Sequence, residues 1–189
     1  MRRGGGRVGV SAFPEPAMAE IGGKPPRSWR PLGILVGLIA IPLIIIDQLS
    51  KNYVASHMML YESIAVVPNW FDITYTQNPG AAFSMFVDLP PIVRLLMLCA
   101  LSTIAIVVLL VMLVQTEKIT LMSFALALVL AGAVGNLIDR ALRGGRVIDF
   151  IRVHYYGASY PIFNVADSAI SVGVALIILS SLFSKKESV

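Results

Sequence analysis

The chain has 189 residues, of which 57% are apolar and 14% charged, and its formal net charge is +4 at pH 7. Soluble domains carry about a quarter charged residues, so this composition excludes an ordinary soluble domain and indicates an integral membrane protein. The single cysteine excludes an intrachain disulfide and leaves a zinc site without a Cys cluster. The small positive charge needs no nucleic-acid partner to explain it. From the length and the apolar composition we expect one compact bundle of spanning helices.

The first 30 residues differ in character from the rest of the chain. Residues 1–30 are rich in Gly, Pro and Arg and have no apolar periodicity, which predicts a disordered cytoplasmic tail that is attracted to anionic lipid. The apolar run that follows, about residues 31–49, is too long for a signal-peptide core and has no small-residue cleavage site. We therefore expect it to be retained as a membrane anchor.

Three further apolar runs, about residues 92–115, 119–138 and 164–183, are long enough to cross about 30 Å of hydrocarbon at 1.5 Å per residue. The sequence thus predicts an all-α bundle of four transmembrane helices, in a single domain over residues 31–186. An even number of spans puts both termini on one side of the membrane. Because Lys and Arg gather before the first run and after the last, the positive-inside rule predicts cytoplasmic termini.

The two connections on the opposite side are about residues 50–91 and 139–163. The first is too long for a mere connector, and its segment FDITYT alternates apolar and polar residues, which predicts a small extracytoplasmic sheet on the membrane surface. The turn signal Asn78-Pro79-Gly80 follows, where a backbone can approach a ligand closely. An ordinary tight turn explains the same residues.

Arginines occur on the side of the membrane that normally lacks them. The second connection carries Arg140, Arg143, Arg146 and Arg152. Local pairing with acidic residues or with lipid phosphate explains these arginines better than topology does.

Helical spacing organises the polar residues of the apolar runs. Asp47 and Lys51 are four residues apart, which fits either a local ion pair or side chains that extend to the interface. Asn136, Asp139 and Arg140 share one helix face, and we expect them to form a hydrogen-bonded cluster with a structural role.

Two acids have apolar neighbours. Asp149 lies in VIDF and Asp167 in FNVADSAI. Two carboxyls held close in such surroundings cannot easily both ionise, so they would share a proton, which is the chemistry of an aspartic protease. Asn164 and Asp167 also have the spacing of a capping box at a helix start, and that alternative gives Asp167 a purely structural role. It leaves Asp149 unexplained. The acid–base chemistry requires no metal or cofactor.

Other classes of function fit less well. The only histidines, His57 and His154, lie in the loops and far in sequence from Cys99, which disfavours serine or cysteine catalysis. A small proton-coupled transporter would also use intramembrane acids. It would be expected to show internal repeats and helices broken at mid-bilayer, whereas these polar residues gather at one end of the spans.

Five segments carry a resemblance to a known family. They are DQLSK (47–51), NPGAAFS (78–84), GNLIDR (135–140), VIDF (147–150) and FNVADSAI (163–170). In this order they resemble the bacterial lipoprotein signal peptidases, also called signal peptidase II, and the resemblance covers residues 31–186.

The resemblance implies a multi-pass aspartyl endopeptidase of the bacterial inner membrane, and we expect the protein to be a monomer. It would remove signal peptides from prolipoproteins by cutting just before the diacylglyceryl-modified cysteine, at the periplasmic face, with the substrate's acyl chains in the bilayer. Its catalytic dyad would be Asp149 and Asp167. The supporting residues it implies are Asp47, Lys51, Asn78, Gly80, Asn136, Asp139, Arg140 and Asn164.

Overall fold

The computed structural model describes residues 29–80 and 89–184. The predicted tail, apart from its last two residues, lies outside this part of the chain. So does the end of the NPGAAFS segment, from residue 81 onward.

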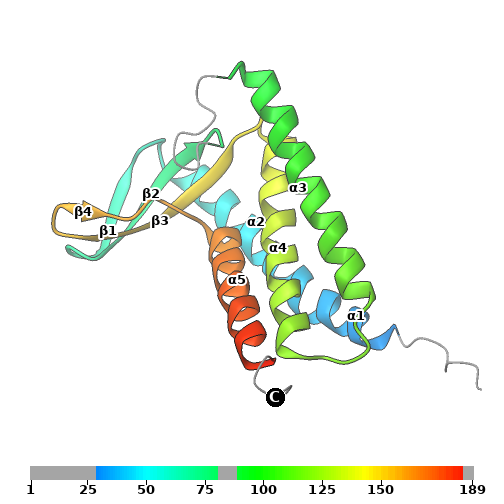
Figure 1. The fold of residues 1–189 in the computed structure, drawn as a ribbon. Helices are drawn as coiled ribbons and strands as arrows, with labels where there is room; N and C mark the ends of the chain where they lie inside the picture. Colours follow the sequence, from blue (N-terminus) through cyan, green and yellow to red (C-terminus); the bar gives the residue numbers. More distant parts are fainter. Residues whose placement is uncertain (1–28, 81–88, 185–189) are drawn as a thin grey trace, which may run out of the picture.

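Four helical spans form the body of the protein. They are α1 (Arg30–Leu35) continued by η1 (Val36–Ala40) and α2 (Ile41–His57), then α3 (Pro91–Val114), α4 (Leu121–Leu142) and α5 (Val165–Ser184). Each is long and apolar enough to cross a membrane, as predicted. The start of α1 and the end of α5 lie at one end of the bundle, here called the terminal end, and the sheet lies at the other, the sheet end (Figure 1).

The first span contains an irregular turn and is longer than expected. Pro42 has no N–H for a hydrogen bond to the residue four positions earlier. The chain accommodates it with a π-helical turn, in which the N–H of Ile41 donates to the carbonyl of Val36. The span then ends at His57 rather than near residue 49. The polar residues in its last two turns are typical of a loop, which is why the sequence predicts an earlier end. In the structure these turns are helical, and Lys51 is buried.

Helix α4 is the centre of the bundle. In its most apolar stretch 56% of the residues are buried, against 11% in α3 and 17% in each of the other two spans. Glycines bring the neighbouring helices close to it. A Cβ on Gly173 of α5 would lie 2.6 Å from Cγ2 of Val129, and one on Gly135 of α4 would lie 2.7 Å from Oδ2 of Asp47. Both positions therefore require glycine for packing.

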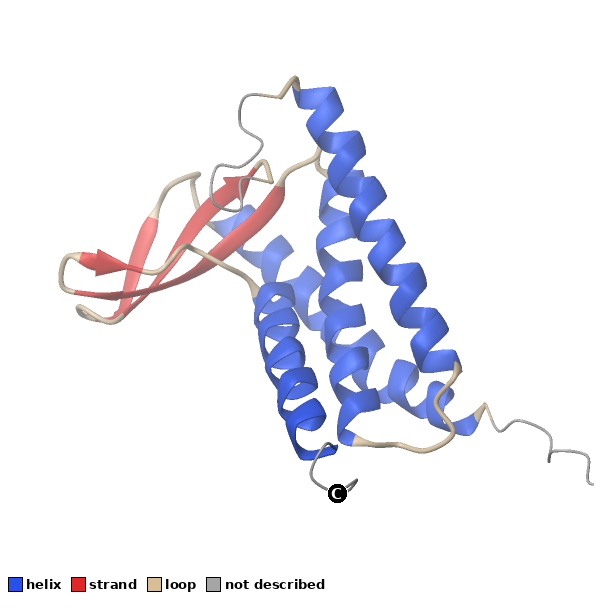
Figure 2. Cartoon of the chain, in the orientation of Figure 1, coloured by secondary structure: helices blue, strands red, loops and turns tan. Residues whose placement is uncertain are grey.

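A four-stranded antiparallel sheet makes the predicted all-α class too narrow (Figure 2). Its strands, in spatial order, are β1 (Ser63–Val67), β2 (Phe71–Asn78), β3 (Val147–Tyr155) and β4 (Ala158–Ser159). The segment FDITYT forms most of β2, as predicted. Strands β3 and β4 were not predicted. Since the first four residues of β3 are all buried, they lack the alternation that marks a half-exposed strand.

The pairing of β3 places its acid beside the start of α5. Asp149 pairs with Thr76 of β2. On the other side of β3, the N–H groups of Phe150 and Ile151 donate to the carbonyl of Phe163, at 3.0 and 2.8 Å. Asn164 follows immediately, so the chain enters α5 next to Asp149.

Candidate active site

Asp149 and Asp167, 18 positions apart in sequence, face a common set of amide side chains. Asp149 lies in β3 and is 2% exposed. Asp167 is the third residue of α5 and is partly exposed. Asn164 donates to both carboxyls, through its backbone N–H to Asp167 and through its side chain to Asp149, so the structure brings the two predicted dyad residues together.

Asp167 also takes part in the predicted capping box. Its backbone N–H donates to Oδ1 of Asn164 at 2.9 Å, and its Oδ2 accepts from the N–H of Asn164 at 3.3 Å. This confirms the helix-start interpretation. It does not account for the other oxygen, Oδ1, which accepts from Nδ2 of Asn136 at 2.7 Å. The carboxyl therefore caps the helix and faces the site at the same time.

Three asparagines fix the two carboxyls in place. Asn164 is fully buried, and its Nδ2 donates to Oδ1 of Asp149 at 2.7 Å and to the carbonyl of Ile148 at 3.2 Å. Asn78 makes a further side-chain hydrogen bond to Asp149. Since Asn136 holds Asp167, each carboxyl has at least one amide that fixes its orientation.

A buried ionic cluster lies behind the asparagines. The ammonium of Lys51 is fully buried, 2.8 Å from Oδ2 of Asp47 and 3.1 Å from Oδ2 of Asp139. It also donates to Oδ1 of Asn136 at 3.0 Å, which orients the amide of Asn136 so that its NH₂ faces Asp167. The predicted Asp47–Lys51 pair is therefore real, and the alternative of side chains extending to the interface is wrong.

Asp139 lies in a buried hydrogen-bonded cluster, but Arg140 is not its partner there. Its Oδ2 accepts from the backbone N–H of Ile148 at 3.1 Å, which ties α4 to β3. Its Oδ1 accepts from Gln48 and pairs with Arg143, 3.2 Å away. Arg140, the expected partner, points elsewhere and donates to Ser102 of α3 at 3.3 Å. Position i+4 from Asp139 is occupied by Arg143, and helical spacing favours that pair.

The turn at the end of β2 lies beside the dyad. The N–H of Gly80 donates to Oδ1 of Asn78 at 2.9 Å, and Gly80 has a φ of +95°. A Cβ at Gly80 would overlap the side chain of Leu98 on α3. The glycine is thus required by packing against α3 and by its backbone conformation.

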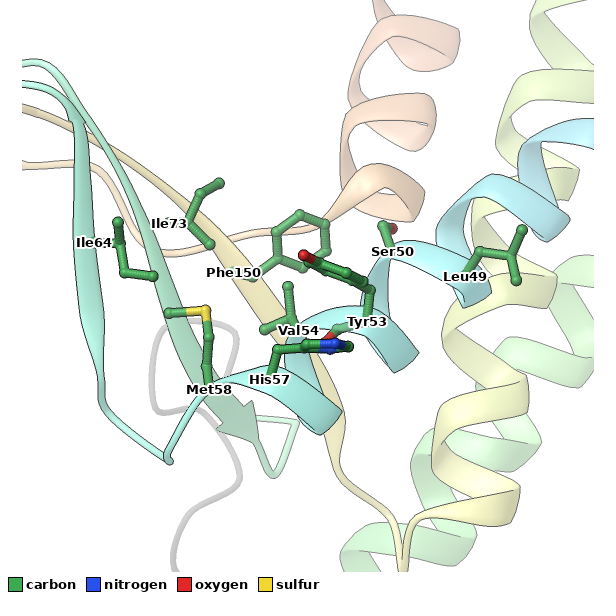
Figure 3. A pocket seen from close by; sticks show the side chains of 9 residues that line it. All are labelled: Leu49, Ser50, Tyr53, Val54, His57, Met58, Ile64, Ile73 and Phe150. Atoms are coloured by element: carbon green, nitrogen blue, oxygen red, sulfur yellow. The ribbon is translucent and has the colours of Figure 1, made fainter.

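Two of the cavities toward the sheet end differ in what lines them, and one of these two contains a carboxyl of the dyad. The larger, about 820 Å³, lies between α2 and the sheet, where Tyr53, His57, Ile73 and Phe150 line it (Figure 3). None of its lining residues is acidic. Size therefore does not identify the active site.

The second cavity, about 400 Å³, lies against α4 between α3 and α5. Asp167, Asn136 and Arg140 line it together with apolar side chains such as Leu101. Leu101 is 53% exposed, so the cavity continues onto the lipid-facing surface of α3.

Burial and a neighbouring acid perturb the ionisation of the dyad. Desolvation, and after it the charge of Asp167, raise the pKa of Asp149 to about 7. Hydrogen bonds from Asn78 and Asn164 oppose this shift. Asp149 is therefore able to hold a proton near neutral pH, as a general acid must.

Gln48 belongs to the site and was not predicted. Its Nε2 donates to Oδ2 of Asp47 at 3.1 Å, to Oδ1 of Asp139 at 3.0 Å and to the carbonyl of Gly135 at 3.1 Å. A signal was present in the sequence, because a glutamine next to an aspartate in an apolar span needs polar partners. Among the residues that the structure describes, no group of three or more His, Cys, Asp or Glu side chains is placed to hold a metal ion.

Comparisons with known proteins agree on one family. Residues 39–183 match the family model described as Signal peptidase (SPase) II. The chain is 43% identical to a lipoprotein signal peptidase of Syntrophus aciditrophicus, covering 84% of this chain and 98% of that protein. It is 40% identical to one of Shewanella piezotolerans, covering 86% and 94%.

Two solved structures share the fold of this chain. A bacterial membrane enzyme determined by the in meso method at 2.3 Å resolution is 33% identical, with a TM-score of 0.74, over 84% of this chain and 93% of that one. A second, determined at 1.9 Å resolution, is 34% identical with a TM-score of 0.70, over 80% and 94%.

Proposed function

Since this chain belongs to the signal peptidase II family, it is an aspartic peptidase that removes the signal peptides of prolipoproteins, and we propose that Asp149 and Asp167 are its catalytic dyad. The observation that carries this assignment is the shared amide frame, in which Asn164 holds Asp149 and Asn136 holds Asp167. Two carboxyls fixed side by side in this way are able to act on one water molecule. The family assignment leaves no support for a transporter.

The environments of the two carboxyls assign their roles. Both oxygens of Asp167 accept hydrogen bonds, and the residue lies in the first turn of α5, where the helix dipole favours negative charge. Asp167 is therefore the ionised member. Asp149 is buried in a strand, with a pKa raised to about 7 by desolvation and by Asp167, and it carries the proton.

The reaction follows from these roles. Asp167 takes a proton from a water molecule, which attacks the scissile carbonyl carbon, while Asp149 donates its proton to the carbonyl oxygen. In the second step the proton on Asp167 passes to the leaving nitrogen as the peptide bond breaks, and Asp149 recovers its proton from the tetrahedral intermediate.

The substrate is recognised together with its lipid. Asp167 lies three residues below the N-cap of α5, about 5 Å into the helix. The 400 Å³ cavity beside it is apolar on its α3 side and reaches the lipid-facing surface through Leu101. A prolipoprotein that approaches within the bilayer is able to place its acyl chains there and its scissile bond at the dyad. No second chain is needed, because one copy supplies all the residues named, so the enzyme acts as a monomer.

In the cell, the sheet end faces the periplasm and both termini face the cytoplasm of a bacterial inner membrane. Two observations support this orientation. Basic residues lie near both ends of the sequence, and the start of α1 and the end of α5 both lie at the terminal end of the bundle (Figure 1). A reporter that is active only in the periplasm should stay silent when fused after Val189 and be active when inserted between Leu60 and Tyr61. The opposite pattern would contradict the orientation.

The function is tested with one prolipoprotein in two forms, with and without the diacylglyceryl group on its cysteine. The purified chain should cleave the modified form just before that cysteine, as mass spectrometry of the products would reveal. The unmodified form should be cleaved much more slowly. Equal rates would exclude recognition of the lipid, and cleavage at another bond would exclude the assigned specificity.

A further inference from the structure

The arginines at the sheet end are not all neutralised by protein carboxylates. Arg143 pairs with Asp139 at 3.2 Å, and Arg152 lies 3.7 Å from Asp72. Within the described ranges, Arg94 and Arg146 form no ion pair with any acidic side chain. No carboxylate in the described part of the chain therefore neutralises these two side chains.

These two arginines line the same small cavity. It has a volume of about 120 Å³ and lies between the start of α3 and the loop after α4, where Gly144 and Gly145 form part of its wall. This volume holds only a few water molecules, since each water takes about 30 Å³ in the liquid. It is too small for a peptide segment and suits a single compact group.

The loop is built to place Arg146 at this cavity. Gly145 has a φ of +85°, and a Cβ there would lie only 3.1 Å from Cδ1 of Leu95, so glycine allows the loop to pack on α3. Arg146 donates one hydrogen bond to Oε1 of Gln77 at 3.3 Å. A guanidinium has five N–H donors, so most of them remain for a ligand that accepts several hydrogen bonds.

The position of Arg94 identifies the membrane as the source of that ligand. Arg94 is the fourth residue of α3, about 4.5 Å into the span. Its neighbours Ile92, Val93 and Leu96 are 60%, 45% and 63% exposed, so they face acyl chains when the helix is in a bilayer. An anion that meets Arg94 at this depth is the phosphate of a phospholipid, because guanidinium groups bind phosphate oxygens in pairs.

We propose that Arg94, Arg146 and the Gly144–Gly145 loop form a binding site for the phosphate group of an outer-leaflet phospholipid. The site contains no residue of the catalytic dyad or of its amide frame. A diacylglyceryl-modified prolipoprotein has no phosphate on its lipid, so the site selects a membrane lipid and not the substrate. A lipid held here anchors the start of α3 to the loop after α4.

The test compares two short-chain lipids that differ only in the headgroup. Binding of dioctanoyl phosphatidylglycerol and of dioctanoylglycerol to the detergent-solubilised full chain is measured by native mass spectrometry. The wild type should prefer the phosphatidylglycerol by about a hundredfold, and the preference should fall about tenfold for each arginine replaced in Arg94→Gln and Arg146→Gln. Lys118→Gln, which removes an exposed cation at the terminal end, should bind as the wild type does.

Several results would overturn the proposal. They are a wild type without preference, a double variant that keeps the full preference, and a Lys118→Gln variant that loses as much as the double variant does. If inorganic phosphate alone displaced the lipid completely, the site would be one for a free anion. The variants Arg94→Lys and Arg146→Lys keep the charge and guard against misfolding, and they should retain part of the preference. The double glutamine variant should still cleave substrate in lipid-free detergent, and loss of that cleavage would assign the arginines to the substrate site.

Discussion

Replacement of Lys51 by methionine tests the buried ionic cluster. The ammonium of Lys51 is fully buried and contacts Asp47, Asp139 and Asn136 at 2.8, 3.1 and 3.0 Å. Methionine fills much of the same space without the charge, so the change leaves two buried carboxylates with one fewer partner and creates little empty volume.

The cost of Lys51→Met follows from the loss of that partner. Removing one member of a buried ion pair destabilises a protein by about 3–5 kcal/mol, because the remaining charge stays buried. At roughly 2–4 °C per kcal/mol for a chain of this size, Tm should fall by about 6–20 °C. Asp139 keeps Arg143 at 3.2 Å, whereas Asp47 loses its only ion-pair partner in the described structure.

Thermal unfolding of the purified protein in detergent measures this effect. Lys118→Met is the matched control, because Lys118 is exposed and its loss should change stability by less than about 0.5 kcal/mol. The double variant Lys51→Met, Asp47→Asn should be less destabilised than Lys51→Met alone, since the charge left unpaired is also removed. A Lys51→Met protein that melts with the wild type would refute the reasoning, and so would a double variant that melts below the single one.

Four further predictions concern pH and packing. Above pH 7 the cleavage rate should fall about tenfold per pH unit, because Asp149 loses its proton as the pH rises through its raised pKa; an unchanged rate up to pH 9 would exclude it as the acid. Because the pKa of Asp149 is raised, the folded state binds this proton more tightly than the unfolded chain does. Tm of the wild type should therefore decrease as the pH rises from 5 to 8, and Tm of Asp149→Asn should decrease less. Melting curves recorded over this pH range test the prediction. Asp139→Asn should lower Tm and activity together, and an inactive variant with an unchanged Tm would contradict the structural role of this residue. Gly135→Ala should lower both as well, because its Cβ would lie 2.7 Å from Oδ2 of Asp47; a variant with wild-type Tm would show that α2 and α4 separate easily.

The parts of the fold that depend on local patterns were predictable. Each span contains a long apolar stretch, and Asn164 with Asp167 forms the capping box that their spacing indicates. The end of α2 was missed, because Lys51 suggests a solvated segment when its buried partners are unknown. Strand β3 was missed because burial on both faces removes the alternation that marks a strand.

The composition of the site was predictable only in part. Physical reasoning indicated that Asp149 and Asp167 would interact, but the contact depends on the pairing of Phe163 with Ile151, a long-range feature that no local pattern encodes. The partner of Asp139 depends on side-chain direction. Spacing allowed both Arg140 and Arg143, and only the structure distinguishes them.

The central claim is that Asp149 and Asp167 cleave the substrate as a pair. Asparagine has almost the same shape as aspartate but cannot transfer the proton. The most direct measurement is therefore the cleavage rate of Asp149→Asn and of Asp167→Asn on a diacylglyceryl-modified prolipoprotein, with folding verified by Tm. Both variants should remain folded and lose cleavage by at least about a hundredfold, since each lacks a carboxyl that transfers a proton in the reaction. A folded variant of either kind that cleaves at the wild-type rate would contradict the dyad.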